Sequence, residues 1–548
     1  MPRLIIDNRA VEVPDGATIL DAAEKLQIAI PTMCFLRDPA LRESKGYEPS
    51  TSCMVCVVKV EGWDGLVPAC GTLAQDGMRV YSNSPEVRDT RKAALELLLS
   101  DHLGDCLGPC QVTCPAGMNI PLMIRQIAAG QLREAIATVK EDIALPAVLG
   151  RICPAPCERA CRRAAFDQPV SICLLKRYVA DVDLQSPTPH LPTGKPSRNK
   201  RVAIIGAGPA GLAAAYYLRQ DGFECTIYDE HDEPGGMLRY GVSPERLGRD
   251  VLASEIASIM KLGVEFRGRT RIGSSLSTEQ IRKQFDAVFV AVGGLKPGDA
   301  ESLGLEAGSH GINVDSKTYA TDVQGVFAGG DAVRKRKLTV RAVADGKEAA
   351  VAIGQYLAGQ RVTGPTKAFN SRIGKLADGE IDAFVAGASK VARVQPSTDG
   401  AGFTDEQARS EAARCLHCDC RKAESCKLRQ YAQEYEARPT RYKPASSRGS
   451  RQAPGEVEGV VRRLFVQHTQ HPDIIYEPGK CIRCGLCIKI AAQAGERPGL
   501  TFVGRGFDVR VAVPFDGQLA DALKTAARQC VAACPTGALA FKDEVENS

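Results

Sequence analysis

The chain has 548 residues, of which 70 are Lys or Arg and 65 are Asp or Glu, so its formal net charge is only +5. This balance argues against nucleic acid or a membrane surface as the main partner, and the apolar runs are too short for a transmembrane helix. The length is sufficient for roughly three to five domains. The first residues lack the apolar core of a signal peptide, so we expect a cytoplasmic protein.

The chain also contains 21 cysteines, many of them grouped at short spacing. A reducing compartment does not support a disulfide framework of that size. Short cysteine spacings are typical of thiolate ligation of iron–sulfur clusters. We therefore predict that metal cofactors organise much of the fold.

Residues 1–82 are predicted to form a small β-rich domain. Residues 4–7 and 10–13 have strand character around a turn, and residues 18–26 have the pattern of an amphipathic helix. The cysteines that follow are Cys34, Cys53, Cys56 and Cys70. Two single cysteines on either side of a close pair favour a [2Fe–2S] cluster, and a zinc site is the alternative.

This first region resembles the N-terminal domain of the large iron–sulfur subunit of complex I and its relatives in iron-only hydrogenases. The resemblance is carried by the entry Ile30-Pro-Thr-Met-Cys34 and by Cys53-Met-Val-Cys56. It implies a β-grasp, ferredoxin-like fold with the four cysteines as ligands.

Residues 83–195 have mainly helical character and carry a second group of potential ligands. These are His102, Cys106, Cys110, Cys114, Cys153, Cys157 and Cys161. Pro115 directly follows Cys114, a feature familiar from ferredoxins. The region resembles the two-cluster helical domain of the glutamate synthase small subunit and of dihydropyrimidine dehydrogenase. The resemblance implies one [4Fe–4S] cluster on Cys106, Cys110 and Cys161, and another on Cys114, Cys153 and Cys157.

The fourth ligands of these two clusters differ from the family pattern. His102 stands where those relatives have a cysteine, and the complex I subunit has a histidine ligand at the corresponding place. For the second cluster the relatives use Glu or Gln, whereas this chain has Lys176. Cys173, one helical turn earlier, is our candidate; water or an open iron site is the alternative.

Residues 196–365 contain a dinucleotide-binding pattern. An apolar strand at Val202–Ile205 leads into Gly206-x-Gly208-x-x-Gly211 and then into an Ala-rich helix. The three glycines allow a tight turn, close approach to a pyrophosphate, and close helix–strand packing. A second strand ends at Asp229, where an acid can bind a ribose hydroxyl.

Two further loops resemble those of the glutamate synthase family and imply FAD rather than NAD at this site. They are the stretch from Glu233 to Gly241 and the fingerprint from Gly325 to Asp331. The resemblance implies that FAD contacts Gly206, Gly208, Pro209, Ala210, Gly211, Asp229, Glu230, Gly235, Gly236, Met237, Leu238, Gly330, Asp331 and Thr339.

In those relatives a complete NAD(P)H-binding domain is inserted between the strand like residues 286–292 and the strand like residues 325–328. Here about 32 residues separate the two strands, and they contain no second GxGxxG. One βαβ unit alone needs roughly 30 residues, and a whole dinucleotide-binding domain needs several times as many. We therefore predict that the NAD(P)H domain is missing.

Residues 366–440 form a linker with four thiols within a 12-residue stretch: Cys415, Cys418, Cys420 and Cys426. They favour a [4Fe–4S] cluster, with zinc as the alternative. Residues 436–455 are rich in Arg, Pro and Ser and are predicted to form a second linker. The last domain, residues 441–548, contains Cys481-x-x-Cys484-x-x-Cys487. The fourth ligand there is Cys530 or Cys534, and the complex I subunit, which uses a Cys-Pro-Thr-Gly sequence, favours Cys534.

The overall prediction is a multidomain α/β and α+β protein. Its parts are a β-grasp [2Fe–2S] domain, a helical two-cluster domain, a Rossmann-like FAD domain and a C-terminal ferredoxin-like [4Fe–4S] domain. One FAD, one [2Fe–2S] and four [4Fe–4S] clusters are expected, and beyond these cofactors no substrate-shaped motif stands out.

The leading hypothesis is an oxidoreductase subunit that transfers electrons between FAD, its clusters and partner subunits. The partners would be a catalytic dehydrogenase or reductase and an NADH- or ferredoxin-linked subunit. Flavin-based electron bifurcation is a bolder form of the same hypothesis. The alternative is a self-contained oxidoreductase that transfers electrons from NAD(P)H to an acceptor such as ferredoxin.

Overall fold

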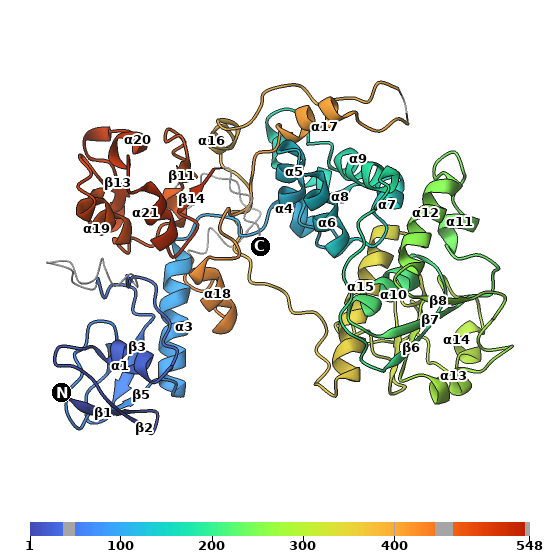
Figure 1. Cartoon of the computed structure of the whole chain (residues 1–548), viewed down its shortest axis with the longest axis horizontal. Helices are drawn as coiled ribbons and strands as arrows, with labels where there is room; N and C mark the ends of the chain where they lie inside the picture. The colour runs from blue at the N-terminus through green and yellow to red at the C-terminus, as the bar shows by residue number, and fades with distance from the viewer. Residues whose placement is uncertain (37–49, 399, 444–463, 543–548) are drawn as a thin grey trace. The chain divides into compact units, whose positions relative to one another are not determined.

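The computed structural model describes residues 1–36, 50–398, 400–443 and 464–542 (Figure 1). The chain divides into two compact units. Unit 1 comprises residues 1–107, 368–387 and 417–548, and unit 2 comprises residues 108–367 and 388–416. Most of the Arg-, Pro- and Ser-rich segment expected after residue 436 lies outside the described residues.

The N-terminal part of unit 1 is a mixed five-stranded sheet with the order β2-β1-β5-β3-β4. Its strands are β1 (Arg3–Ile6), β2 (Arg9–Glu12), β3 (Val57–Val60), β4 (Leu66–Pro68) and β5 (Arg79–Tyr81). β1 pairs antiparallel with β2 and parallel with β5. Helix α1 (Ile19–Lys25) begins at Thr18, which forms a reciprocal capping box with Asp21. The predicted strands and helix of this region are confirmed.

Helix α3 (Pro85–Ser100) also belongs to unit 1, so the expected boundary at residue 83 does not separate compact units. The reason is a buried arginine. Arg91 donates two hydrogen bonds to the carbonyl oxygen of Val57, at 3.2 and 2.8 Å, and one to the hydroxyl of Tyr435 at 3.1 Å. These bonds join α3 to strand β3 and to the end of α18 (Lys427–Glu434).

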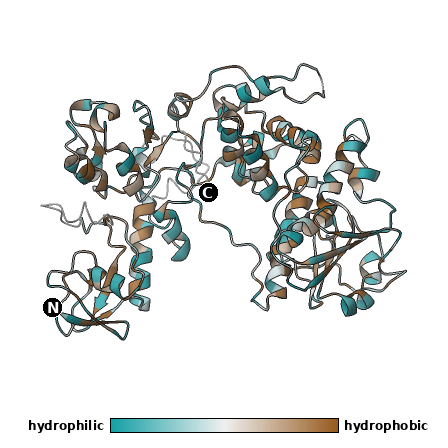
Figure 2. Cartoon of the chain, in the orientation of Figure 1, coloured by the Kyte–Doolittle hydropathy of each residue, from teal (hydrophilic) through white to brown (hydrophobic). Residues whose placement is uncertain are grey.

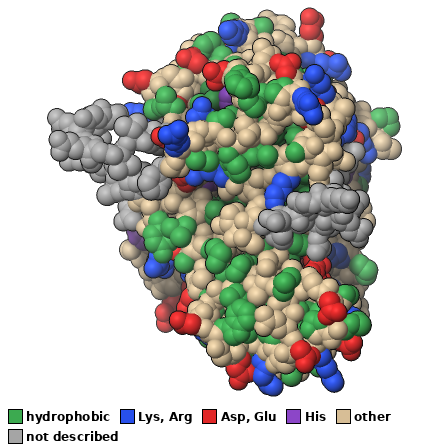
Figure 3. Space-filling model, turned by 90° about the vertical axis from the view of Figure 1, so that its left-hand side faces the viewer, with side chains coloured by type: hydrophobic (Ala, Val, Ile, Leu, Met, Phe, Trp, Pro, Cys, Tyr) green, Lys and Arg blue, Asp and Glu red, His purple; other side chains and the backbone are tan. Residues whose placement is uncertain are grey.

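The C-terminal part of unit 1 is built from short elements. Two antiparallel pairs, β11 (Ile474–Tyr476) with β14 (Leu539–Phe541) and β12 (Thr501–Val503) with β13 (Arg510–Ala512), are its described strands. The helices are α19 (Leu486–Gln493), α20 (Leu519–Ala522) and α21 (Ala527–Ala533), and α16 (Glu380–Val385) comes from the earlier segment of the unit. On the face drawn in Figure 3, hydrophobic side chains and charges of both signs are interspersed.

Unit 2 begins with the predicted helical region, which is confirmed. Its α-helices are α4 (Pro109–Thr113), α5 (Ile120–Ala128), α6 (Leu132–Asp142), α7 (Pro146–Ile152), α8 (Pro156–Arg159), α9 (Ile172–Gln185) and α17 (Asp405–Ala412). Helices α7 and α9 pack closely at Gly150, where a Cβ would lie 2.8 Å from the Cα of Arg177.

The same unit contains a parallel five-stranded sheet with the order β10-β9-β6-β7-β8. The strands are β6 (Arg201–Ile205), β7 (Glu224–Tyr228), β8 (Glu265–Arg267), β9 (Ala287–Val290) and β10 (Val326–Ala328). The central strands are buried and hydrophobic, as expected for a sheet covered on both faces (Figure 2). The accompanying helices are α10 (Pro209–Gln220), α11 (Met237–Tyr240), α12 (Arg249–Met260), α13 (Thr278–Gln284), α14 (Asp299–Ser302) and α15 (Thr339–Leu357).

The helical region and the parallel sheet share one core, so the expected boundary near residue 195 does not separate compact units either. Glu255, on α12, accepts hydrogen bonds from the N–H groups of Ala147 and Val148 at the start of α7, both at 2.8 Å. Burial raises the pKa of this carboxyl to about 7. The free N–H groups at the start of α7 are thus bonded by a side chain from the sheet domain, which links the two regions.

Residues 291–325 connect the neighbouring strands β9 and β10 directly. All of them are described, and their only helix is the four-residue α14; apart from isolated bridges, they contain no strand. A second dinucleotide-binding fold is therefore absent from this connection, as the sequence predicts. Among the described residues, no helix has both the length and the apolar character needed to cross a membrane.

Candidate cofactor sites

The four N-terminal cysteines converge in unit 1, and all four are buried. The sulfur atoms of Cys34 and Cys53 are 3.4 Å apart, and so are those of Cys56 and Cys70. Hydrogen bonding with Cys53 and Cys70 lowers the pKa of Cys34. Two thiolates that share a tetrahedral metal with bonds of about 2.3 Å lie about 3.7 Å apart. Two such pairs fit a two-metal centre better than a single zinc ion.

A second site lies in the C-terminal part of unit 1. Cys481, Cys484, Cys487 and Cys534 line one cavity together with Tyr476 and Thr536. The positive φ angles of Arg483 (55°) and Gly485 (74°) turn the chain between the first three cysteines. The arrangement fits the three-plus-one ligand pattern that the sequence predicts for one cluster.

Cys530, the alternative fourth ligand, is not among the residues lining that cavity. Its side chain is buried, and its sulfur lies 3.6 Å from the carbonyl oxygen of Cys487. Burial raises its pKa to about 12. The geometry therefore groups Cys534, and not Cys530, with the other three thiols.

A third group of ligands in unit 1 differs from the expected one. The N–H of Cys420 donates to the carbonyl oxygen of Cys106 at 3.2 Å, and the charges of Cys106 and Cys420 both act on the Cys426 thiol. Gly537 gives these residues room, because a Cβ there would lie 2.2 Å from the sulfur of Cys420. The resemblance implies a cluster of Cys106 with Cys110 and Cys161, whereas the structure brings Cys106 beside Cys420 and Cys426.

His102 lies just before Cys106 in the sequence, in a segment that is not helical. Its Nδ1 atom is buried and has no hydrogen-bond partner among the described residues. Burial, reinforced by the charges of Lys480 and Lys443, lowers its pKa to about 3. The imidazole is therefore neutral at pH 7, which is the form that binds a metal.

In unit 2, four thiols surround a buried lysine. Cys114, Cys153, Cys157 and Cys173 all act on the ammonium group of Lys176, and together they raise its pKa although burial lowers it. Hydrogen bonding with Cys173 lowers the pKa of Cys153 to about 6. Cys173 therefore lies with the three cysteines of the expected second cluster, and Lys176 lies next to them.

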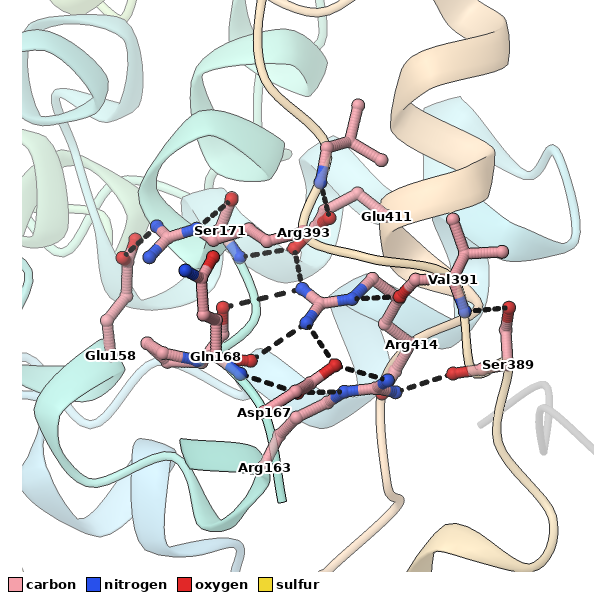
Figure 4. Close-up of polar contacts among 12 residues, drawn as sticks. Glu158, Arg163, Asp167, Gln168, Ser171, Ser389, Val391, Arg393, Glu411 and Arg414 are labelled. Carbon is pink, nitrogen blue, oxygen red and sulfur yellow. Dashed lines mark hydrogen bonds and ion pairs between the residues drawn. The ribbon is translucent and has the colours of Figure 1, made fainter. Parts of the chain in front are cut away.

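A buried ionic network in unit 2 joins the segment that follows Cys161 to the segment that leads into Cys415 (Figure 4). The side chains of Arg163 and Arg414 are completely buried, and both pair with the carboxylate of Asp167, at 2.8 and 3.1 Å. Arg163 also donates to the carbonyl oxygen of Arg414 at 2.6 Å, the peptide directly before Cys415. Arg163, which lies two residues after Cys161 in the sequence, therefore anchors the segment that carries Cys415.

The glycine-rich loop joins β6 to α10 in the way the sequence predicts. Gly206 has a φ of 109°, and a Cβ there would lie 2.4 Å from the carbonyl oxygen of Ala291. At Gly211 a Cβ would lie 2.0 Å from the carbonyl oxygen of Gly206, so only glycine lets the helix approach the turn. Gly208 has open space beside it at the N-terminus of α10, where a pyrophosphate binds in this kind of loop.

Two other segments meet the glycine loop. Asp229, at the end of β7, accepts the N–H of Ala207 at 2.7 Å, and the carbonyl oxygen of Ala207 accepts the N–H of Gly235 at 2.9 Å. Gly236 is so close that its Cβ would lie 2.8 Å from the Cα of Gly208. Of the remaining candidates here, Leu238 is buried, Met237 is exposed, and Glu230 pairs with Arg271 at the surface.

The loop after β10 completes this edge of the sheet. Gly330 lies 3.1 Å (measured from a Cβ built on it) from the side chain of Ala210 and donates its N–H to Asp345 at 3.2 Å. The carboxylate of Asp331 accepts the N–H groups of Arg336 and Lys337. Thr339 is the first residue of α15. The expected FAD residues thus gather at the carboxyl ends of the parallel strands, the usual ligand site of such sheets.

Several buried charged residues near these sites are not among the sequence-based candidates. Lys480 and Glu477 form a fully buried ion pair at 2.5 Å, and Lys480 lies within electrostatic reach of His102, Cys106 and Cys420. Arg163, Arg414 and Glu411 are equally buried. Only the position of Lys480, directly before a cluster cysteine, offers a signal in the sequence.

No three His, Cys, Asp or Glu side chains of the described residues are close enough together to hold a single metal ion. A cluster of several irons needs its ligands further apart than a single ion does, because each ligand binds a different iron. The wider spacing of the cysteine groups is compatible with clusters.

Comparison with known families matches three parts of the chain. Residues 3–85 match the 2Fe-2S iron-sulfur cluster binding domain, and residues 103–188 match the 4Fe-4S cluster domain II of dihydropyrimidine dehydrogenase. Residues 204–254 match the NAD(P)-binding Rossmann-like domain. The predicted [2Fe–2S], helical [4Fe–4S] and Rossmann-like regions are confirmed at this level.

Individual proteins with similar sequences are also oxidoreductase subunits. The NADPH-Fe(3+) oxidoreductase subunit beta of Geobacter sulfurreducens is 40% identical over 205 residues, which are 37% of this chain and 30% of the relative. The NADP(+)-dependent formate dehydrogenase subunit beta of Moorella thermoacetica is 40% identical over 206 residues, which are 34% of this chain and 29% of the relative. The glutamate synthase [NADPH] small chain of Bacillus subtilis is 33% identical over 210 residues, which are 38% of this chain and 42% of the relative.

The resemblance to the glutamate synthase small chain is confirmed. The aligned part of this chain spans less than half the length of each of these three relatives. Their activities are therefore a starting point for a proposal and not a description of this protein.

Proposed function

We propose that this protein is an electron-transfer iron–sulfur flavoprotein subunit of a larger oxidoreductase. In this proposal unit 2 holds FAD at the carboxyl edge of its parallel sheet, and the two units together hold one [2Fe–2S] and four [4Fe–4S] clusters. When bound, FAD exchanges electrons in pairs or singly, and each cluster exchanges one at a time. The chain supplies the thiols, the glycine-rich loops and the buried charges that hold these groups.

The observation that carries the proposal is the direct connection between β9 and β10. In the relatives whose central region this chain resembles, that connection is where the NAD(P)H domain is inserted. Here residues 291–325 contain only a four-residue helix. We infer that this chain does not bind a nicotinamide against its own flavin, so a reductant or an acceptor on another subunit is required.

A second support is that the three thiol sites of unit 1 adjoin one another. Cys34 of the N-terminal site acts electrostatically on Cys484 of the C-terminal site. Cys426 is affected by Cys534, and the N–H of Lys427 donates to the carbonyl oxygen of Pro535 at 2.9 Å. A contiguous row of redox sites is the arrangement that conduction needs, whereas isolated structural metal sites need no such contact.

The names of two relatives suggest the kind of partner. Both are beta subunits, one of an NADPH-Fe(3+) oxidoreductase and one of an NADP(+)-dependent formate dehydrogenase. We infer that the partners are a catalytic dehydrogenase or reductase and an NADH- or ferredoxin-linked subunit.

Anaerobically purified chain tests this proposal. It should contain about 18 iron atoms per FAD, from four [4Fe–4S] and one [2Fe–2S]. Dithionite should bleach the visible bands of both flavin and clusters, whereas NADH or NADPH alone should leave the flavin oxidised for minutes. Prompt flavin bleaching by NADH or NADPH would favour the alternative, a self-contained NAD(P)H:acceptor oxidoreductase. Iron that dithionite cannot reduce would instead indicate structural metal sites.

A further inference from the structure

We propose that the cysteine stretch Cys415–Cys426 does not hold one cluster but supplies ligands to two. Cys420 and Cys426 join His102 and Cys106 in one [4Fe–4S] centre, and Cys415 joins Cys110 and Cys161 in another. The inference rests on the proposed function only in that both require iron–sulfur clusters.

The division of the chain passes through this stretch. Unit 2 ends with Leu416, and unit 1 resumes at His417. Cys415 therefore belongs to a different compact unit from Cys420 and Cys426. A single cluster would require ligands from both units within 12 residues, whereas each unit already offers further ligands beside its own part of the stretch.

In unit 1 the ligands meet around a shared set of contacts. Cys420 is bonded through its N–H to the carbonyl oxygen of Cys106, whose own N–H donates to the carbonyl oxygen of Ser371 at 3.1 Å. The sulfur of Cys106 accepts a hydrogen bond from the N–H of Ser371 at 3.4 Å. Hydrogen bonds of this kind to ligand sulfur are typical of cluster sites and raise their potential.

His102 supplies the independent sign of a ligand in this group. A buried imidazole nitrogen without a hydrogen-bond partner is costly unless something absent from the polypeptide binds it. The loop that carries His102 is fixed, because the N–H of Leu103 donates to the carbonyl oxygen of Gly479 at 2.7 Å. Lys480, next to Gly479, lies within electrostatic reach of His102, Cys106 and Cys420, so the three residues share one neighbourhood.

In unit 2 the ionic network of Figure 4 positions the other ligand. Arg414 lies near enough to act on the Cys161 thiol, and Arg163 holds the peptide that leads into Cys415. Helix α4, which carries Cys110, packs against α8, which precedes Cys161. Cys110, Cys161 and Cys415 also pack against the same hydrophobic core.

The regrouping keeps the expected number of clusters but changes which residues depend on each other. In a single-motif arrangement, loss of Cys415 and loss of Cys420 would damage the same centre. In the regrouped arrangement, loss of Cys420 damages the centre of His102, and loss of Cys415 damages the centre of Cys161.

Single variants of the full-length chain, purified anaerobically, separate the two arrangements. Dithionite-reduced protein is studied by electron paramagnetic resonance at several temperatures, together with its iron content. We expect Cys420→Ser and Cys426→Ser to remove or convert one and the same cluster signal. Cys415→Ser and Cys161→Ser should alter a second signal and leave the first unchanged. Cys225→Ser, a buried thiol outside every group, is the matched control and should leave all signals in place.

His102→Cys replaces the neutral imidazole with a thiolate ligand, so the centre retains four ligands, whereas a serine variant risks losing its cluster. Thiolate adds a negative charge to the centre, so its midpoint potential should fall in an EPR-monitored redox titration. Under the regrouping, the shifted signal is the one missing in Cys420→Ser. If Cys415→Ser and Cys420→Ser change the same signal, or if His102→Cys shifts the signal lost in Cys161→Ser, the regrouping is wrong. Protein that contains no iron at all would overturn the proposed function itself.

Discussion

Lys176 places a buried positive charge beside one of the predicted cluster sites. Its side chain is 5% exposed, and its charge lies among the four thiols Cys114, Cys153, Cys157 and Cys173. Where the resemblance leads us to expect a Glu or Gln ligand, this chain has a cation that cannot ligate while protonated. A fixed positive charge stabilises the electron added when a cluster is reduced.

We predict that Lys176→Met lowers the midpoint potential of this centre. A unit charge about 8 Å away contributes roughly 2 kcal/mol at an effective dielectric constant of about 20, which for one electron is on the order of 90 mV. Lys176→Arg keeps the charge and should keep the potential within a small fraction of that shift. An EPR-monitored redox titration measures both, and an unchanged potential in Lys176→Met would show that solvent or cluster charge screens the lysine.

The network around Arg414 makes a second prediction at this scale. Glu411 and Arg414 are both completely buried and pair at 2.7 Å. Glu411→Gln removes one charge and leaves a buried guanidinium undercompensated, which typically costs about 3–5 kcal/mol. The variant should therefore have a clearly lower apparent melting temperature under argon and should lose the iron of the Cys161–Cys415 centre first.

Glu424→Gln is the control for that variant. Glu424 pairs with Arg429 at 3.0 Å, but its carboxylate is 83% exposed, and exposed pairs contribute at most about 1 kcal/mol. Equal destabilisation by the two substitutions would mean that burial does not determine the contribution of the Glu411–Arg414 pair.

At the scale of elements, the contact between helices α10 and α15 holds the nucleotide site together. Gly346 of α15 faces α10, and a Cβ there would lie 2.2 Å from the carbonyl oxygen of Ala210. The same Ala210 packs against Gly330, so the helix contact and the loop after β10 depend on each other. Backbone atoms cannot yield as a side-chain end can, so the helices would have to separate.

We therefore predict that Gly346→Ala reduces the FAD content of purified protein several-fold and destabilises unit 2 by about 1–3 kcal/mol, the usual cost of overpacking. Gly354→Ala on the same helix is the matched control. Its Cβ would meet nothing closer than a ring carbon of Phe223 at 3.6 Å, so it should bind FAD normally and gain the better helix propensity of alanine. FAD content is measured from the flavin released on denaturation, and normal content in Gly346→Ala would contradict the prediction.

The short elements of the C-terminal part of unit 1 lead us to expect that this part depends on its clusters for stability. Strands β11 to β14 have three residues each, and the core of this part includes the cysteines Cys484 and Cys530. The parallel sheet of unit 2, in contrast, has a continuous aliphatic core along β6 and β9. Small domains with few apolar residues commonly need metals to stay folded.

For the whole molecule we predict a difference between the two parts when iron is removed. Chelation under mild oxidation should increase amide hydrogen exchange strongly in residues 474–541 and only slightly in strands β6, β7 and β9. Hydrogen–deuterium exchange with mass spectrometry measures both regions in one sample. Uniform loss of protection would mean that the clusters stabilise the parallel sheet as much as the C-terminal region.

The organisation into two compact units also determines how the predicted cluster ligands are divided along the chain. The helical segment after residue 108 shares its core with the parallel sheet, through contacts such as that of Glu255 with the start of α7. The segment before it belongs to unit 1 through Arg91. Ligands that are neighbours in sequence, such as Cys106 and Cys110, therefore fall in different units.

The sequence by itself determined the local features of this protein. The capping box at Thr18, the glycine turn at Gly206, the cysteine pairs at short spacing and the missing insert before Val326 all depend on a few consecutive residues. Their physical causes are local: side-chain bonds to nearby N–H groups, positive φ angles, ligand reach and chain length.

Only the tertiary structure decided how distant ligands are combined. The contact of Cys106 with Cys420, the grouping of Cys534 with Cys481, Cys484 and Cys487, and the bond from Arg163 to the peptide before Cys415 join segments separated by tens to hundreds of residues. Spacing along the chain carries no information about such contacts, because they are set by which helices pack together and by where a buried charge can find its partner.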